Sequence, residues 1–370
     1  MATGAGIMTQ HSIPCLFMRG GTSRGPFFDL RDLPADPDIR DRVLLSAMGS
    51  PDARQIDGLG GATMLTSKIA MVTPSKRQGI DVDYLFAQVW LDEAIVDTTP
   101  SCGNMLAGVG PFAIERGMVK TTGNETYINI FNVNTQSHIE AIVQTPQGVV
   151  TYAGNQHIDG VPGTGAPILL NFTHIMGSKC GTLLPTGKAQ EEIDGIPVSC
   201  IDVAMPMVIM RANDLGITSY EANAISSNKA LMQRIESIRL EAGLRMGLGD
   251  VTQTVIPKVS ILAQARRGGV VFSYYLTPHH MHAAHAVTGA ICVACCTSIH
   301  NTVAGTLTKR DQDSPSTIQI EHPSGAIDVQ LEISGSGKDT QVQSAGIVRT
   351  ARKIMDGELF VPANLWPSSS

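Results

Sequence analysis

The sequence predicts an α+β protein of two domains built mostly from antiparallel sheet. Its 370 residues suffice for two hydrophobic cores, since a single domain usually has about 100–200 residues. A content of 37 glycines against only 5% aromatic residues favours many tight turns and hence a strand-rich fold. Short segments of alternating apolar and polar residues outnumber helical patterns, and Gly, Pro, Asn or Asp separates them.

Alternation predicts strands along the whole chain, and two segments have helical spacing. The predicted strands are Ile13–Met18, Val82–Leu91, Tyr127–Phe131, His138–Val143, Val149–Ala153, Val198–Ile201 and Val270–Leu276. The first predicted helix, Ile39–Met48, follows Asp36 as a cap and Pro37 in the first turn. The second, Lys229–Arg245, carries apolar residues on one face.

Two further helices, Gly103–Glu115 and Gly289–Ile299, look like copies of one structural unit. A glycine-containing loop precedes each apolar helix, and a hairpin with a polar turn follows it. The hairpins are Tyr127–Phe131 with His138–Val143, and Thr317–Glu321 with Ala326–Ile333. The repeat predicts two similar domains, each with a buried helix against a sheet and a boundary near Pro185–Pro197.

Composition excludes several classes of protein. The net charge of −6, without a Lys/Arg cluster, argues against a nucleic-acid partner. Met1–Gln10 lacks the pattern of a secretory signal, and the longest apolar stretch, Ala286–Ile299, is too short to span a membrane. The seven cysteines are odd in number and lack metal-ribbon spacing, which indicates free thiols in a reducing compartment. We therefore expect a cytoplasmic protein without nucleic-acid or membrane partners.

The segment Ser101-Cys102-Gly103-Asn104 carries the strongest chemical signal. It follows the extended run 94–99 and opens a stretch with helical spacing, which places Cys102 at a helix N-terminus. Unpaired N–H groups and the helix dipole there favour a thiolate and form a pocket for a carboxylate. A reactive thiol beside a carboxylate pocket predicts proton transfer or nucleophilic attack on a carboxylic acid substrate. The alternative is that Cys102 is a buried small apolar residue, as free cysteines often are.

Several motifs follow in order along the chain. They are Met18–Gly25, Gln55–Gly58, Leu65–Lys68, Asp81–Phe86, the Cys102 segment, Asp159–Gly163, Leu248–Val251, Glu321–Gly325 and Arg349–Lys353. This set resembles the PrpF-like isomerases, which include 4-oxalomesaconate tautomerases and isomerases of methylaconitate-type acids. The resemblance extends from Ile13 to Val361, almost the whole chain.

The resemblance implies the diaminopimelate-epimerase-like fold. That fold has two pseudo-symmetric domains, each a mostly antiparallel sheet or barrel around a central helix, with the active site between them. The expected N-terminal domain comprises residues 11–187 together with 340–362, because the last segment returns to it. Residues 188–339 form the expected C-terminal domain.

The resemblance also implies Lys68 and Cys102 as the catalytic residues. The related epimerases use two thiols, but Ala286 stands where the second cysteine would be, which argues against two-thiol racemisation. Lys68 is then the base and Cys102 the partner acid/base. The expected substrate-binding residues are Arg19, Gly20, Gly21, Thr22, Ser23, Ser67, Gly103, Asn104, Met105, His279, Thr288, Gly289, Ala290 and Ser324.

These residues predict a 1,3-allylic proton shift or a keto–enol tautomerisation in a small anionic substrate, an unsaturated di- or tricarboxylic acid. The preferred substrate is 4-oxalomesaconate, and aconitate, methylaconitate and methylitaconate are close alternatives. The reaction needs neither a cofactor nor a metal. Two other classes stay open: a cysteine hydrolase, and a non-catalytic carboxylate-binding protein.

The histidine cluster between His279 and His285 permits a zinc site if it is helical. It has no evident carboxylate or cysteine partner in the sequence, so we expect structural or substrate-contacting histidines instead of metal ligands. The oligomeric state is not fixed by the sequence, and a homodimer stays open.

Overall fold

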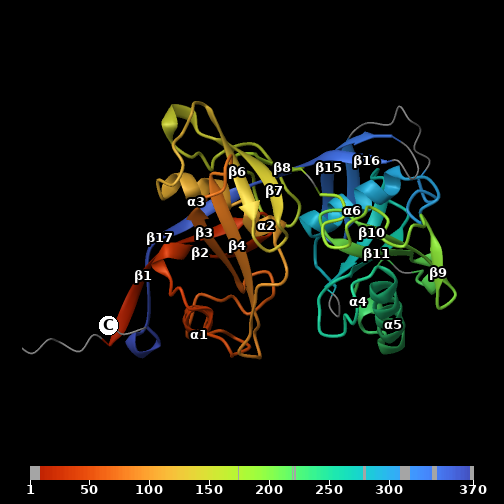
Figure 1. The fold of residues 1–370 in the computed structure, drawn as a ribbon, viewed down its shortest axis with the longest axis horizontal. Coiled ribbons are helices and arrows are strands. Elements are labelled where there is room, and N and C mark those ends of the chain that lie inside the picture. Colours follow the sequence, from red (N-terminus) through yellow and green to blue (C-terminus); the bar gives the residue numbers. More distant parts are fainter. Residues whose placement is uncertain are drawn as a thin grey trace, which may run out of the picture. The chain divides into compact units, whose positions relative to one another are not determined.

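The computed structural model describes residues 9–173, 175–218, 220, 222–277, 281–308, 317–335 and 340–366. The chain forms two compact units (Figure 1). The first comprises Met1–Asn134, Ile142–Asn155 and Thr350–Ser370, and the second Thr135–Ala141 and Gln156–Arg349. The C-terminal segment thus belongs with the N-terminal part of the chain.

The limits of these units differ from the expected domain boundaries at 187/188 and 339/340. Residues 156–187 and 340–349 fall in the second unit. The reason is strand pairing: β8 (Ile168–Thr173) runs antiparallel along β16 (Gln341–Arg349), and β16 pairs in turn with β15 (Gly325–Ser334).

The sheet of the first unit has the strand order β17–β1–β2–β3–β4, with β5 and β6 both beside β4. Its strands are β1 (Gln10–Gly20), β2 (Ser23–Asp29), β3 (Lys68–Pro74), β4 (Val82–Val89), β5 (Val96–Asp97), β6 (Glu125–Asn132) and β17 (Ala351–Pro362). The pairs β2–β3 and β4–β6 are parallel, and the others are antiparallel. Strand β7 (Ser137–Gln144) is divided between the two units.

The sheet of the second unit has the strand order β9–β10–β11–β12–β13–β14–β15–β16–β8. Its remaining strands are β9 (Glu191–Ile193), β10 (Ile196–Asp202), β11 (Pro206–Arg211), β12 (Lys258–Ala263), β13 (Val271–Leu276) and β14 (Thr317–His322). The pairs β11–β12 and β13–β14 are parallel. Together with the helices, this mixed sheet confirms the α+β class.

The helices are α1 (Pro37–Met48), α2 (Gly103–Leu106), α3 (Val109–Glu115), α4 (Ala222–Ser226), α5 (Lys229–Arg245) and α6 (Val287–Ser298). The predicted cap of α1 is confirmed, because an Asp36 carboxylate oxygen accepts from the N–H groups of Asp38 and Ile39 at 2.9 and 3.1 Å. Helix α2 lies against β1, β2 and β3, and α6 packs on strands from β10 to β16. Each unit therefore holds a buried helix against its sheet.

The structure corrects three sequence predictions. The single helix predicted at Gly103–Glu115 is two helices, because Pro111 has no N–H to donate to the preceding turn. Helix α6 starts at Val287, two residues before the predicted start. Val149–Ala153 is not a strand; Val149 is 62% exposed and follows a 3-10 turn at Pro146–Gly148.

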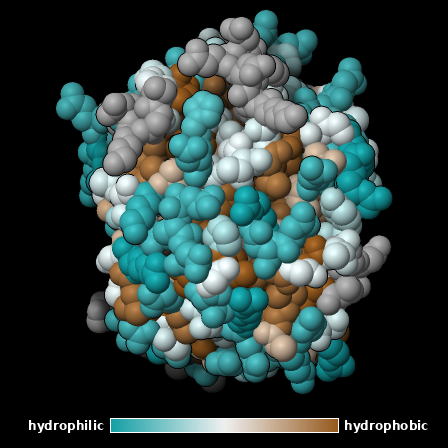
Figure 2. Space-filling model, turned by 90° about the vertical axis from the view of Figure 1, so that its right-hand side faces the viewer, coloured by the Kyte–Doolittle hydropathy of each residue, from teal (hydrophilic) through white to brown (hydrophobic). Residues whose placement is uncertain are grey.

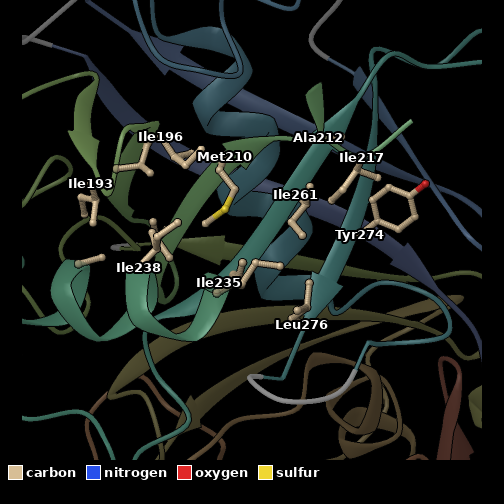
Figure 3. Packing of buried hydrophobic residues seen from close by; sticks show 14 of the residues in the cluster. Ile193, Ile196, Met210, Ala212, Ile217, Ile235, Ile238, Ile261, Tyr274 and Leu276 are labelled. Carbon is tan, nitrogen blue, oxygen red and sulfur yellow. The ribbon is translucent and has the colours of Figure 1, made fainter. Parts of the chain in front are cut away.

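A cluster of buried apolar side chains forms the core between α5 and the sheet of the second unit (Figure 3). From α5, Ile235 and Ile238 contribute to it, and Met210, Ile261 and Tyr274 contribute from the strands. The first unit has its own cluster between α1 and strands β1 to β4. The helical spacing of α5 and the alternation of the strands thus bury one face of each.

Figure 2 shows one face of the molecule, on which hydrophilic residues are interspersed with hydrophobic ones. Of the helices in the described part of the chain, none is both long and apolar enough to cross a membrane.

Arg239 of α5 is a fully buried cation whose hydrogen bonds join the helix to the following loop. Its guanidinium donates twice to the Glu236 carboxylate, at 2.7 Å each. It also donates to the carbonyl oxygens of Val251 and Ile256 at 3.0 and 3.2 Å. The ion pair and the carbonyl bonds offset the desolvation of this side chain.

We expect Arg239→Met to lower the free energy of unfolding by about 3 kcal/mol or more, because it leaves a carboxylate and buried carbonyl groups without their donor. Arg234 on the same helix pairs with Asp194 at the surface, and Arg234→Met should cost less than about 1 kcal/mol. Urea unfolding of both variants measures the difference. Equal losses would contradict the role assigned to Arg239.

Candidate active site

Side chains on one face of β4 contact both predicted catalytic residues. Tyr84, Phe86 and Gln88 alternate along the strand and share this face. The Lys68 Nζ donates to Gln88 Oε1 at 2.7 Å and lies 5.0 Å from the centre of the Phe86 ring. The Tyr84 hydroxyl donates to the carbonyl oxygen of Cys102 at 3.2 Å. Successive side chains on one face of a strand are roughly 7 Å apart, and Phe86 lies between Tyr84 and Gln88, so the two hydrogen-bonded contacts are separated by one side chain on the same face.

The orientation of the Gln88 carboxamide is fixed by the backbone next to Lys68. Its Nε2 donates to the carbonyl oxygens of Ser67 and Met64 at 2.7 and 3.3 Å. The Oε1 is therefore turned towards the amine of Lys68, a residue that is only 9% exposed. A single preferred position for the Nζ atom follows from these bonds.

Ser67, a predicted substrate-binding residue, is fully buried and bonded within the fold. Its hydroxyl donates to the Val89 carbonyl at 2.8 Å and accepts from Gln55 Nε2 at 2.7 Å. These bonds give Ser67 a role in anchoring the start of β3, immediately before Lys68.

Cys102 caps α2, as the sequence predicts for a residue at a helix start. Its Sγ accepts the backbone N–H of Met105 at 3.5 Å, and the residue is 8% exposed. Gly103 is the first residue of α2. Burial and the neighbouring Cys102 raise the pKa of Tyr84 well above its ordinary value, so the Tyr84 hydroxyl stays a donor.

The turn between β1 and β2 packs against the start of α2 so closely that only glycine fits. A Cβ atom on Gly20 would lie 2.5 Å from the Asn104 carbonyl oxygen, and one on Gly21 would lie 2.1 Å from the Asn104 Oδ1. Gly21 also has a φ of +50°, which favours glycine. A Cβ on Gly25 would lie 1.8 Å from the Lys68 carbonyl oxygen.

Two hydroxyl groups in this turn have no hydrogen-bond partner among the described residues. They are Thr22 Oγ1 and Ser23 Oγ, and both atoms are buried. The backbone N–H of Thr22 donates to Asn104 Oδ1 at 3.4 Å, which places the turn beside α2. An unpaired buried hydroxyl costs about 1–3 kcal/mol, so these groups are suited to bind the oxygen atoms of a ligand.

Arg19 donates to the backbone of its own unit. Its Nη1 donates to the carbonyl oxygens of Gly21 and Thr350 at 2.8 and 2.9 Å. Burial and the positive charge of Arg352 lower the pKa of Arg19. The guanidinium thus fixes the β1–β2 turn to the start of β17.

Three predicted substrate-binding residues, Thr288, Gly289 and Ala290, lie in the first turn of α6 in the second unit. Thr288 Oγ1 donates to Met205 Sδ at 3.2 Å. A Cβ on Gly289 would lie 2.4 Å from the Tyr275 ring, so the helix and β13 approach closely there. Ala290 is fully buried.

Ser324 lies in the β14–β15 turn of the same unit and donates through Oγ to the Ala283 carbonyl. Its N–H donates to His322 Nδ1 at 3.3 Å. His285 is buried and bonded to Ser273 Oγ at 2.8 Å. His279 lies outside the described residues. Over the described ranges, no group of three or more His, Cys, Asp or Glu residues could hold a metal ion.

Sequence reasoning did not assign roles to Tyr84, Phe86 and Gln88. The sequence does contain an indication of the role of Gln88. Alternation places this polar residue on the same strand face as the aromatic residues Tyr84 and Phe86. Polar residues on a buried strand face need partners, and here the partner is the Lys68 amine.

Comparison with known proteins places these features in a family. The family model described as PrpF protein matches residues 10–362. The chain is 51% identical over 351 residues to (4E)-oxalomesaconate Delta-isomerase of Novosphingobium sp. (strain KA1), covering 95% of this chain and 98% of that protein. It is 36% identical to methylitaconate-delta-isomerase, whose crystal structure matches with a TM-score of 0.81 over 98% of this chain and 99% of that one.

A more distant structure confirms the fold. The hydroxyproline epimerase from Agrobacterium vitis matches with a TM-score of 0.56 at 13% identity, over 96% of this chain and 93% of that one. The predicted diaminopimelate-epimerase-like fold is therefore confirmed.

Two buried histidines of the second unit make stability depend on pH. Burial lowers the pKa of His285 to about 3 and that of His322 to about 4. Their pKa in an unfolded chain is near 6.5, so the unfolded chain binds more protons between these values. The stability that these neutral histidines contribute is fully present above pH 6.5 and is lost as pH falls towards 4 and below.

We expect the free energy of unfolding of the wild type to fall between pH 6.5 and pH 4.5 and His322→Gln to reduce this slope, because one proton-binding group is removed from the unfolded chain. His300→Gln, a change at an exposed histidine, is the control. Urea unfolding at several pH values measures the slopes. A slope unchanged in His322→Gln would contradict the assignment.

Proposed function

Because this chain belongs to the PrpF family, we propose that it is an isomerase of an unsaturated di- or tricarboxylic acid, with 4-oxalomesaconate as the preferred substrate. The observation that carries the proposal is that Lys68 and Cys102, which we assign as the proton-transfer groups, both contact side chains on one face of β4. The 51% identity to (4E)-oxalomesaconate Delta-isomerase supports the choice of substrate. We also propose a cytoplasmic location, which the seven free thiols support.

The proposed reaction is a 1,3-allylic proton shift. The neutral Lys68 amine takes a proton from the carbon next to a carboxyl or keto group, and the electron pair spreads over the allylic system as a dienolate. The Cys102 thiol returns a proton at the far carbon of that system, so that the double bond moves and the substrate keeps its composition. After the reaction Lys68 is an ammonium and Cys102 a thiolate. Net transfer of one proton from Lys68 to Cys102 restores both groups for the next turnover.

The surroundings of each group suit its role. Gln88 Oε1 accepts a hydrogen bond from the Lys68 amine. The lone pair on the Lys68 nitrogen is then free to take a proton from the substrate. The face of the Phe86 ring attracts the ammonium that forms when the proton arrives. The Met105 N–H stabilises the thiolate that forms when Cys102 gives up its proton.

The turn between β1 and β2 supplies groups for the substrate. The buried hydroxyls of Thr22 and Ser23 have no other partner in the described part of the chain. We assign them to carboxylate oxygens of the substrate, where fixed donors also stabilise the charge of the dienolate. The cysteine hydrolase alternative is less well supported, because the described partner of the Cys102 thiol is a backbone N–H and not a histidine.

Proton NMR in D₂O tests the proposal with 4-oxalomesaconate, aconitate, methylaconitate and methylitaconate as separate substrates. We expect the wild type to introduce deuterium at an allylic position or to move the double bond in 4-oxalomesaconate. Lys68→Met and Cys102→Ala should each lower this rate by about 10²–10⁴-fold, because each removes one proton-transfer group.

Lys76→Met, a change at an exposed lysine, is the control and should retain the full rate. Exchange in one of the other three acids alone would replace the preferred substrate. Folded wild-type protein that exchanges none of the four acids would overturn the proposal.

A second prediction concerns Gln88 as the residue that positions Lys68. We expect Gln88→Leu to lower kcat roughly tenfold to a hundredfold with little change in KM, because the amine loses its fixed position while the substrate keeps its anchors. Gln88→Glu should shift the pH profile of kcat to higher pH, because a carboxylate favours the ammonium form of Lys68.

Gln144→Leu changes a half-buried glutamine on β7 that donates to Glu125, away from Lys68, and serves as the control for both variants. If kcat and its pH profile stay the same in Gln88→Leu and Gln88→Glu, the residue has no positioning role.

A further inference from the structure

Arg349, the last residue of β16, is a buried cation beside a cavity that the proposed mechanism does not use. The cavity has a volume of about 350 Å³ and lies within the second unit. Side chains of β14, β15 and β16 and of the segment 156–159 line it. Arg349 lines it too and is 7% exposed.

The Arg349 guanidinium donates no described hydrogen bond to a carboxylate, and the charge of Asp328 on the same cavity offsets only part of the effect of burial on its pKa. It forms no ion pair with any described residue, and its Nε is buried without a hydrogen-bond acceptor. Its one described hydrogen bond runs from Nη1 to the Val348 carbonyl at 3.0 Å. Burial lowers the pKa of Arg349 to about 10, which still leaves it charged at neutral pH. The buried Arg239, by contrast, has Glu236 as a partner.

Two carboxylates also line the cavity, and both already have donors. Asp159 Oδ2 accepts from the Ala326 N–H at 2.5 Å, and its Oδ1 lies 3.5 Å from His157 Nδ1. Asp328 Oδ1 accepts from Gln319 Nε2 at 3.0 Å. Among the described residues, the guanidinium is therefore the charged group of this cavity that forms no ion pair.

We propose that this cavity is a binding site for a carboxylate group of a small organic acid, with the Arg349 guanidinium as its counter-ion. A buried cation without a counter-ion is unfavourable, and a bound anion removes that penalty. The planar guanidinium matches the two oxygen atoms of a carboxylate and offers its unpaired Nε for one of them. The choice of a carboxylate over other anions rests on the proposed function, since the chain is assigned to carboxylic acids.

Isothermal titration calorimetry with tricarballylate, a saturated tricarboxylate that cannot isomerise, tests the site on the full chain. We expect the wild type to bind it and Arg349→Met to bind it at least tenfold more weakly. Arg349→Lys should lie between them, because a lysine keeps the charge but not the planar fork. Arg245→Met is the matched control, since Arg245 already has Glu191 and Glu241 as partners.

The folding of Arg349→Met is measured in the same samples. Without ligand it should melt at or above the temperature of the wild type, because an uncompensated buried charge has been replaced by an apolar chain. Tricarballylate should raise the melting temperature of the wild type more than that of Arg349→Met. Equal tricarballylate affinity in the two proteins would overturn the proposal. Binding of inorganic phosphate in place of tricarballylate would overturn the assignment to a carboxylate.

Steady-state kinetics distinguishes two sources of the carboxylate, and each supports the site. If it belongs to the substrate, Arg349→Met raises KM at least tenfold and tricarballylate competes with the substrate. If it belongs to a separate acid, Arg349→Met leaves KM unchanged, and it also leaves unchanged any competition between tricarballylate and the substrate. The calorimetry does not depend on turnover, so failure of the proposed isomerase function leaves the test of the site intact.

Discussion

The antiparallel pairing of β3 with β4 is the constraint on which the candidate active site depends. It sets Lys68 opposite Gln88, whose side chain shares one face of β4 with Tyr84 and Phe86. A slip of one residue would turn Gln88 to the other face and leave the Lys68 amine without its acceptor. The hydrogen bonds of the Gln88 carboxamide to the Ser67 and Met64 carbonyls reinforce the same register.

Close backbone packing brings the remaining groups to this surface. Gly20, Gly21 and Gly25 let the β1–β2 hairpin approach both Asn104 and the Lys68 carbonyl at distances that a side chain would prevent. Arg19 then fixes the hairpin to the Thr350 carbonyl. The glycines and Arg19 thus fix the backbone conformation of the hairpin. The Thr22 and Ser23 hydroxyls, which have no partner among the described residues, are the groups available to bind a ligand.

Local pattern predicted the elements whose burial is one-sided. Helices α1 and α5 and strands β6 and β7 follow from periodicity and caps, because one face of each is buried. Strands such as β3 and β12 were not predicted, since consecutive residues in them are buried and alternation is absent. The break between α2 and α3 was missed because an apolar run hides the effect of Pro111.

The sequence by itself determined the family and the α+β class, and it led to the proposal of Lys68 and Cys102 as the reactive side chains, because motifs and residue chemistry are local properties. Only the tertiary structure decided which groups surround them. Gln88 is 20 residues from Lys68 in the chain, and its role depends on strand register. The lone charge of Arg349 is likewise a tertiary property, because an ion pair is made or left unmade by residues that folding brings together from distant parts of the chain.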